Sequence, residues 1–166
     1  MDIALAANGR QKTRMDKPEN EAHPVVVLAT ARSLPIALLR AREKVMGPIR
    51  AMLASAGVTE QQWRVLRVLD ENGNMDPTKI AERSCLLLPS LTRILQTLAD
   101  KGYVDRLPHP TDGRRLEIAI TPAGRAFIAS NMDESKRITA SLEKQLGKEK
   151  LEALLDLLNE LDGLKL

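Results

Sequence analysis

Along most of this chain, apolar residues recur every three or four positions, the spacing that places them on one face of an α-helix. A shorter segment differs, because Leu116, Ile118 and Ile120 alternate with other residues as in a β-strand. The pattern therefore predicts an α+β chain that is mostly helical. The expected helices cover 34–56, 60–72, 77–84, a segment between 87 and 102, 122–146 and 148–163, and the expected hairpin strands cover 103–108 and 116–120.

Polar residues at the predicted helix starts support these boundaries. Thr59 and Gln62 have the spacing of a capping box, in which each side chain bonds the backbone N–H of the other residue. Asp76 and Thr121 each precede a proline, which combines an N-cap residue with the residue best tolerated at the first helical position. Pro48 lies inside the first long segment and predicts a kink or an interruption there.

The segment between 87 and 102 predicts a helix with two different faces. Leu91, Ile94, Leu95 and Leu98 form an apolar stripe that would face the core. The other positions are small, polar or cationic, and a short predicted helix precedes them. A short helix, a polar-faced helix and a hairpin with basic residues at its tip make up a winged helix-turn-helix, whose second helix enters the DNA major groove.

Candidate DNA contacts follow from this arrangement. Guanidinium groups at the hairpin tip would enter the minor groove, whose negative potential attracts them, and Asp112 would orient Arg114 through an ion pair. The alternative for this tip is a solvated loop with ordinary surface charges. The candidates for the major groove are Pro89, Ser90, Thr92, Arg93 and Gln96, and those of the hairpin are Arg106, Asp112, Arg114 and Arg115.

The predicted terminal helices carry more leucine than one small core needs. These stripes would be buried against a second copy of the chain in a two-fold homodimer, although the last helix has the alternative of packing back on its own chain. Two reading helices predict a palindromic operator in double-stranded DNA, with half-sites about 34–36 Å apart. The leucines in question are Leu34, Leu38, Leu151, Leu154, Leu155, Leu158 and Leu161.

Composition narrows the possible functions. The net charge is +3 and is not concentrated in the reading segment, so charge alone is weak support for a nucleic-acid partner. A single cysteine, Cys85, and the lack of a long apolar run predict a cytoplasmic protein without membrane association. The two histidines, His23 and His109, are far apart, and no phosphate-binding loop or nucleophile motif is present. We therefore expect no metal site, no cofactor and no enzymatic activity.

The pattern also predicts the domain organisation. Residues 1–33 have mixed polarity and no sustained period, which predicts a flexible arm whose basic residues either contact DNA phosphates or form a solvated tail. The domain proper is expected at 34–166. Within it, 59–121 would read DNA, while 34–56 and 122–166 would form the dimer.

Two stretches carry a resemblance to a known family. Residues 112–124, Asp-Gly-Arg-Arg-Leu-Glu-Ile-Ala-Ile-Thr-Pro-Ala-Gly, resemble the wing of MarR-type repressors, and 89–95 resemble their recognition helix. Segments 38–43 and 59–64 resemble the branch of that family that represses operons for homoprotocatechuate degradation. The chain departs from the family pattern at 87–88, where two leucines replace the Ser and Arg of many relatives.

This resemblance implies a repressor that a small aromatic acid releases from DNA. The effector would bind between the dimer helices and the DNA-reading segment. A carboxylate in a mostly apolar cleft requires a guanidinium, which Arg40, Arg42 or Arg64 would supply, while Trp63 would pack against the aromatic ring.

Other functions remain as alternatives. Cys85 precedes the reading helix and would serve as a thiol sensor if its position lowered the thiol pKa, or else as a small buried hydrophobic residue. A helical protein-interaction module would use the same hairpin against a protein partner. A small-molecule carrier or enzyme built on the aromatic pocket is the third alternative.

Overall fold

The computed structural model describes residues 30–109 and 112–165, with only the backbone of residues 31 and 112–114. The expected helices and the expected hairpin are confirmed. In chain order the elements are η1 (Thr30–Arg32), α1 (Leu34–Ser55), α2 (Glu60–Asn72), α3 (Pro77–Arg83), α4 (Leu88–Asp100), β1 (Val104–His109), β2 (Asp112–Ile120), α5 (Pro122–Leu146) and α6 (Lys148–Asp162). Residues 1–29 of the expected arm, including His23, lie outside the described residues.

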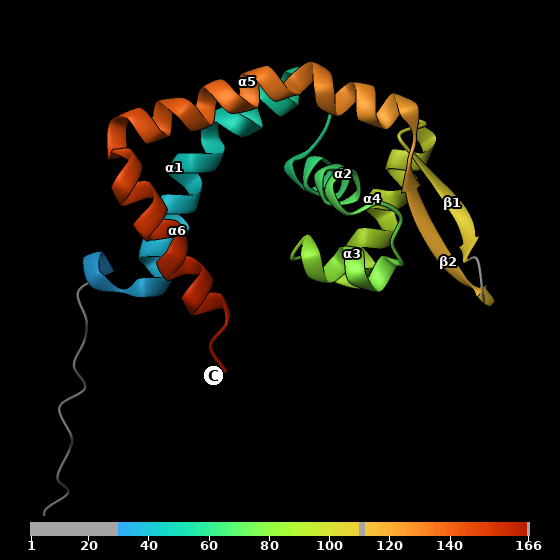
Figure 1. Cartoon of the computed structure of the whole chain (residues 1–166), viewed down its shortest axis with the longest axis horizontal. Helices are drawn as coiled ribbons and strands as arrows, with labels where there is room; N and C mark the ends of the chain where they lie inside the picture. The colour runs from blue at the N-terminus through green and yellow to red at the C-terminus, as the bar shows by residue number, and fades with distance from the viewer. Residues whose placement is uncertain (1–29, 110–111, 166) are drawn as a thin grey trace, which may run out of the picture.

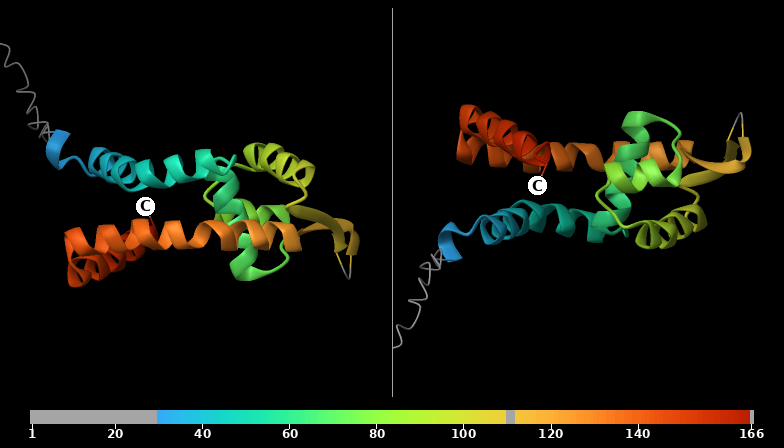
Figure 2. Two further views of the ribbon diagram at one scale, coloured as in Figure 1. Left: turned by 90° about the horizontal axis from the view of Figure 1, so that it is seen from above. Right: turned by 90° about the horizontal axis from the view of Figure 1, so that it is seen from below.

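Helix α5 runs along the long axis of the molecule and connects its two ends (Figure 1). At one end, α2, α3, α4 and the β1–β2 hairpin form a unit that we call the reading lobe, residues 59–121. At the other end lie the N-terminal half of α1 and all of α6. Figure 2 shows, from above and below, that the reading lobe and this second end are separated along α5.

The core lies mainly in the reading lobe, where the apolar stripe of α4 meets α2, α3 and the hairpin. Leu91, Ile94, Leu95 and Leu98 are buried, as the sequence predicts. Burial of this stripe determines which side of α4 faces solvent. The largest fully buried side chains of the surrounding elements are Leu53, Val65, Leu66, Leu69, Ile80, Val104 and Ile118.

The predicted helix caps are confirmed. The backbone N–H of Gln62 donates to Thr59 Oγ1 at 3.2 Å, and the N–H of Thr59 donates to Gln62 Oε1 at 3.0 Å, which completes the capping box of α2. Asp76 accepts from the N–H of Lys79 at 3.0 Å at the start of α3. Thr121 has the same role at the start of α5. These bonds satisfy N–H groups that have no partner within their own helix.

The two strands of the hairpin are antiparallel, and one residue outside the hairpin, Met75, forms an isolated β-bridge to β2. Val104 lies opposite Ile120 and Pro108 opposite Leu116, with an irregularity between Pro108 and His109. Strand β2 begins at Asp112, earlier than the predicted start at 116, because His109 pairs with Asp112 inside the segment predicted as the turn. Met75, just before α3, exchanges both backbone hydrogen bonds with Ile118, at 3.1 and 2.8 Å. The hairpin is thereby joined to the start of α3.

Helix α1 is continuous through Pro48, so of the two predicted outcomes, a kink or an interruption, the interruption does not occur. Proline removes one backbone donor and its ring crowds the preceding turn, which bends a helix without ending it. Figure 1 shows α1 changing direction along its length, with its C-terminal part following α5.

The three aromatic side chains form one cluster that attaches α5 to the reading lobe. The ring centroid of Phe127 lies 4.9 Å from that of Tyr103 in a stacked pair and 6.2 Å from that of Trp63 in an edge-on pair. Gly124 lies nearly one turn earlier in α5, where a Cβ would be 2.8 Å from Ile120 Cγ1 and closer still to the Tyr103 carbonyl oxygen. Only a residue without a side chain permits this approach.

Candidate nucleic-acid interface and effector pocket

The side of α4 turned away from the core is open to solvent. Its exposed residues are Leu88, Asp100 and the predicted DNA contacts Pro89, Ser90, Thr92, Arg93 and Gln96. The Thr92 hydroxyl donates to the Leu88 carbonyl oxygen at 3.1 Å and keeps its lone pairs available to accept a further hydrogen bond. This surface therefore offers donors, acceptors and a positive charge along one helix, which is the chemistry that base edges and phosphates require.

A chain of hydrogen bonds joins α4 to the hairpin. Arg106 of β1 donates to Gln96 Oε1 at 2.9 Å, and Gln96 Nε2 donates to Asp100 Oδ1 at 2.8 Å. Both ends of the Gln96 amide are therefore engaged in the free protein. Arg106, a predicted DNA contact, fixes the hairpin relative to α4.

The base of the hairpin tip is tied to the start of α3. Arg115 Nη2 lies 3.5 Å from Asp76 Oδ2, with 53% of the Arg115 side chain still exposed. The hydrogen bond from the Lys79 backbone, followed by the charges of Lys79 and Arg115, lowers the pKa of Asp76. The side chains of Asp112 and Arg114 lie outside the described residues, so their predicted ion pair stays a prediction.

The N-terminus of α4 is apolar. Its N-cap residue is Leu87, which provides no side-chain hydrogen bond to the helix, and Pro89 occupies its first turn. Leu87 is 77% exposed and Leu88 is 46% exposed. The two leucines that depart from the family pattern thus lie exposed at the N-terminus of α4.

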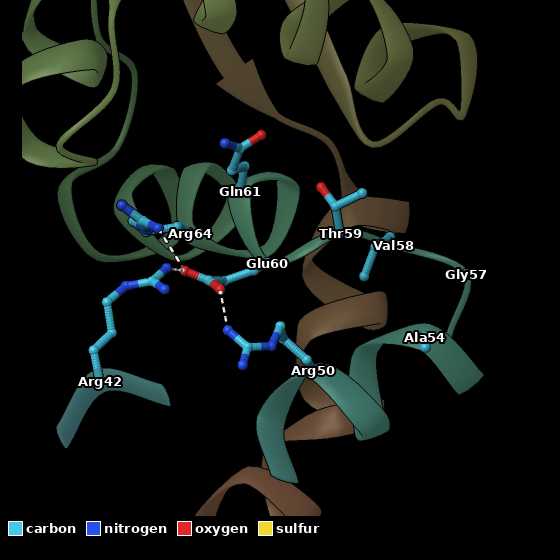
Figure 3. A pocket seen from close by; sticks show the side chains of 9 residues that line it. All are labelled: Arg42, Arg50, Ala54, Gly57, Val58, Thr59, Glu60, Gln61 and Arg64. Carbon is cyan, nitrogen blue, oxygen red and sulfur yellow. Dashed lines mark hydrogen bonds and ion pairs between the residues drawn. The ribbon is translucent and has the colours of Figure 1, made fainter. Parts of the chain in front are cut away.

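A pocket of about 570 Å³ lies where α1, the loop after it and the start of α2 meet (Figure 3). Glu60 lies at its centre, with only 13% of its side chain exposed. Arg42 and Arg64 both bond Glu60 Oε1, the latter at 2.7 Å, and Arg50 Nη1 lies 3.5 Å from Oε2. The remaining lining comes from Ala54, Gly57, Val58, Thr59 and Gln61.

The pocket keeps an excess of positive charge. Arg50 also bonds Glu43, and this hydrogen bond is the main cause of the lowered pKa of Glu43. Three guanidinium groups thus share two carboxylates. A cleft of this size that is partly apolar and carries surplus guanidinium donors suits a small organic anion.

Arg64 connects this pocket to the turn between α3 and α4. While its Nη2 bonds Glu60, its Nη1 donates to the Ser84 carbonyl oxygen at 2.8 Å. Ser84 is fully buried and is the C-cap residue of α3, where its hydroxyl bonds the Ile80 carbonyl oxygen. One side chain therefore contacts both the pocket and the helix-turn-helix.

The structure brings together two of the four predicted effector contacts. Arg42 and Arg64 line the pocket, whereas Arg40 donates to the Thr30 carbonyl oxygen at 3.1 Å and lies outside its lining. Trp63 is buried against Phe127 and is also not part of the lining. Sequence reasoning missed Arg50 and Glu60, although the seven-residue spacing of Glu43 and Arg50 indicated that these two share a helix face.

Comparison with known proteins identifies the fold and its general role. Residues 58–116 match the model of the MarR family. The chain is 40% identical over 129 residues to the HTH-type transcriptional regulator FarR of Neisseria gonorrhoeae, in an alignment that covers 78% of this chain and 88% of that protein. The chain belongs to the MarR family. It is a DNA-binding transcriptional regulator with a winged helix-turn-helix fold, as its sequence predicts.

Other MarR-family proteins extend the comparison. The homoprotocatechuate degradative operon repressor of Escherichia coli is 40% identical over 128 residues, which are 77% of this chain and 86% of that protein. NadR, solved in complex with 4-hydroxyphenylacetate, is 39% identical with a TM-score of 0.72, and the match covers 80% of this chain and 94% of that one. The repressor CouR, solved on a 23-mer DNA duplex, is 29% identical with a TM-score of 0.73 and the same coverage.

The terminal leucines of this MarR-family chain lie at its end remote from the reading lobe. Helix α6 contains no buried residue. Of the leucines in its predicted stripe, Leu151 and Leu161 are half-buried and the others are exposed. The single chain therefore leaves these apolar side chains open to water. Those that are exposed are Leu34, Leu38, Leu154, Leu155 and Leu158.

Cys85 is exposed, so its interpretation as a buried hydrophobic residue is wrong. It follows the C-cap of α3 with a φ of +50°, a left-handed conformation in which glycine is the usual residue.

Among the described residues, no group of three or more His, Cys, Asp or Glu side chains is arranged to hold a metal ion. In the same part of the chain, no helix is long and apolar enough to span a bilayer.

Proposed function

We propose that this MarR-family chain is a homodimeric repressor of an operon for aromatic-acid catabolism and that an aromatic acid releases it from its operator. The observation that carries the proposal is the arginine-rich pocket, which is connected to the helix-turn-helix through Arg64. The names of two relatives add support, since one represses a homoprotocatechuate degradative operon and another was solved with 4-hydroxyphenylacetate.

The dimer would form through the N-terminal half of α1 and through α6. Their leucine stripes are exposed in the single chain, and removing this apolar surface from water favours assembly. A two-fold arrangement buries the same stripe on both copies. In this proposal, residues 34–56 and 122–166 hold the dimer together and residues 59–121 bind DNA.

Each reading lobe would place α4 in the major groove and its hairpin over the adjacent minor groove. Ser90, Thr92 and Arg93 are then the groups nearest the bases and phosphates, while Arg106 holds Gln96 in position. Arg114 and Arg115 complete the contacts from the hairpin. The two-fold axis of the dimer implies an operator that is an imperfect inverted repeat.

The effector would bind through its carboxylate in the pocket around Glu60. Arg42 and Arg64 already share Glu60 Oε1, so a second carboxylate gives these donors another acceptor. The ring would meet the apolar lining at Ala54 and Val58. The surplus positive charge favours an acid over a neutral phenol.

Release would work by a shift between two arrangements of the reading lobes. If the effector draws Arg64 from the Ser84 carbonyl oxygen, the turn before α4 loses a hydrogen bond and the reading helices take a spacing that no longer fits successive major grooves. A hundredfold loss of operator affinity requires about 2.7 kcal/mol of differential binding.

The test uses the full chain and a fluorescent duplex from upstream of its own gene, with anisotropy measured at rising 4-hydroxyphenylacetate concentration. Arg42→Ala should bind the duplex as the wild type does but should need about 10- to 100-fold more acid for release, since it loses one charge-assisted contact. Arg40→Ala is the matched control, because Arg40 lies outside the pocket lining, and its release curve should equal that of the wild type.

The other outcomes distinguish the alternatives. Binding that no aromatic acid reverses would contradict the effector assignment while leaving the operator assignment in place. Release by a mild thiol oxidant, abolished by Cys85→Ser, would instead support thiol sensing. A lack of salt-dependent affinity for any duplex would favour a protein partner over DNA.

A further inference from the structure

Leu87 and Leu88 form an exposed apolar pair at the start of the reading helix. At 77% exposure, Leu87 is the most solvent-accessible large hydrophobic residue in the described part of the chain. These two residues belong neither to the core nor to the leucines of α1 and α6, which lie at the other end of α5 (Figure 1). The pair instead adjoins Ser90 and Arg93 on the surface proposed to meet the major groove.

The chemistry of the major groove offers one apolar partner at base edges. Adenine, guanine and cytosine present hydrogen-bond donors and acceptors there but no methyl group, whereas thymine presents its C5-methyl group beside its O4 acceptor. A leucine side chain has no donor or acceptor, so placing it against a polar base edge leaves a desolvated group without a partner. Placing it against a thymine methyl buries apolar surface on both sides.

We propose that Leu87 and Leu88 read the C5-methyl groups of thymines in each half-site of the operator. The N-terminal residues of a helix-turn-helix reading helix are those that reach base edges, and these leucines occupy that end of α4. The inference rests on the proposed function, since it requires the chain to bind DNA through α4. It names the base that this chain selects where its first turn meets the groove.

A polar cap residue at this point would favour other bases. A serine or arginine there would bond a purine edge or a phosphate, whereas the first turn of this chain has no side-chain cap. Leucine at positions 87 and 88 thus determines which base is preferred at this point, while the phosphate contacts of the reading lobe do not depend on it.

The experiment compares thymine with uracil, which differ only by the C5-methyl group. Duplexes enriched by the full chain from a random-sequence pool are resynthesised with deoxyuridine in place of thymine, one position at a time. At the thymines that meet Leu87 or Leu88, each lost methyl should weaken binding about fourfold, and the symmetric change in both half-sites should weaken it about 16-fold.

Matched variants assign the effect to these side chains. Leu87→Ala combined with Leu88→Ala should bind thymine and uracil duplexes equally, and because both residues are exposed the fold should be unchanged. Leu157→Ala removes an exposed leucine of α6, which does not meet DNA in this proposal. The ratio of its affinities for thymine and uracil duplexes should therefore equal the wild-type ratio, whatever the change does to the dimer.

Three results would overturn the inference. Equal affinity of the wild type for thymine and uracil at every position would show that no methyl is read. A preference for thymine that persists in the double alanine variant would assign the reading to other residues. Failure to enrich any duplex would contradict the proposed function, and this inference with it.

Discussion

Gly124 illustrates how much of this fold depends on single positions. The start of α5 passes so close to the Tyr103 carbonyl oxygen that no side chain fits between them. The same few residues carry the Thr121 cap of α5, whose hydroxyl also donates to the Gly102 carbonyl oxygen at 2.7 Å. The distance between α5 and the reading lobe is therefore set by a backbone contact, which cannot relax by a change of side-chain rotamer.

Gly124→Ala is expected to destabilise the protein by about 1–3 kcal/mol, because the added methyl group overlaps a backbone atom and the helix must shift. Gly47→Ala is the matched control. Gly47 is also helical, but a Cβ there meets nothing within 4 Å, so this change should stabilise α1 by about 0.5–1 kcal/mol. Urea unfolding followed by circular dichroism measures both. Equal effects of the two substitutions would contradict the close approach.

At the residue scale, the sequence was sufficient to predict side chains whose burial or exposure depends only on their position within one helix. The buried stripe of α4 and its exposed polar residues follow from helical periodicity alone. The pocket was only half predicted, because Arg42 and Arg50 of α1 meet Glu60 of α2 through the packing of two helices. That convergence depends on how α1 and α2 cross, and periodicity holds no information about crossing angles.

Among the secondary-structure elements, α3 is held at its start by interactions with the wing. Asp76 caps α3 and lies near Arg115 of β2, while Met75 pairs with Ile118 of the same strand. The caps could be predicted from sequence because each involves residues three positions apart. The pairing of Met75 with β2 could not be predicted, because it joins segments more than 40 residues apart and has no repeating pattern.

Asp76 makes the stability of this junction depend on pH. A carboxyl group with a pKa lower in the folded than in the unfolded state adds stability above its unfolded pKa, about 3.9, and loses it as pH falls through the folded value. Asp76→Asn keeps an amide oxygen for the cap but removes the charge. The variant should be less stable than the wild type by about 0.5–1 kcal/mol at pH 7.

The difference between Asp76→Asn and the wild type should shrink as the pH falls from about 3.9 toward the lower folded pKa of Asp76, and it should vanish once that carboxyl is protonated in the folded protein as well. Urea unfolding at pH 7 and near pH 3 measures it. Asp70→Asn changes an exposed acid of α2 and should alter stability little at either pH. A difference for Asp76→Asn that is the same at both pH values would exclude the charge as its cause.

At the scale of the whole molecule, exposed leucines of α1 and α6 gather at the end of α5 that is remote from the reading lobe. Their periodicity was visible in the sequence, and the exposure of α6 agrees with it. The sequence could not determine how two copies would meet, because the same stripe fits more than one packing geometry.

Leu154→Asp combined with Leu158→Asp is expected to convert the proposed dimer to a monomer, because two carboxylates on each copy would be buried without partners. Analytical ultracentrifugation measures the state of assembly, and duplex binding should weaken in parallel. Ala153→Asp places one carboxylate on the exposed opposite side of α6 and should leave the assembly intact. A monomeric wild type, or a double variant that remains dimeric, would contradict the proposed interface.

The 25-residue length of α5 has a mechanical consequence. A helix of that length is about 37 Å long, so rotating it by about 5° around one end displaces the other by about 3 Å. Gly124 and the aromatic cluster attach one end of this helix to the reading lobe, and its opposite end continues into α6. A small tilt at the subunit boundary would thus be amplified into a step comparable to the rise between stacked base pairs.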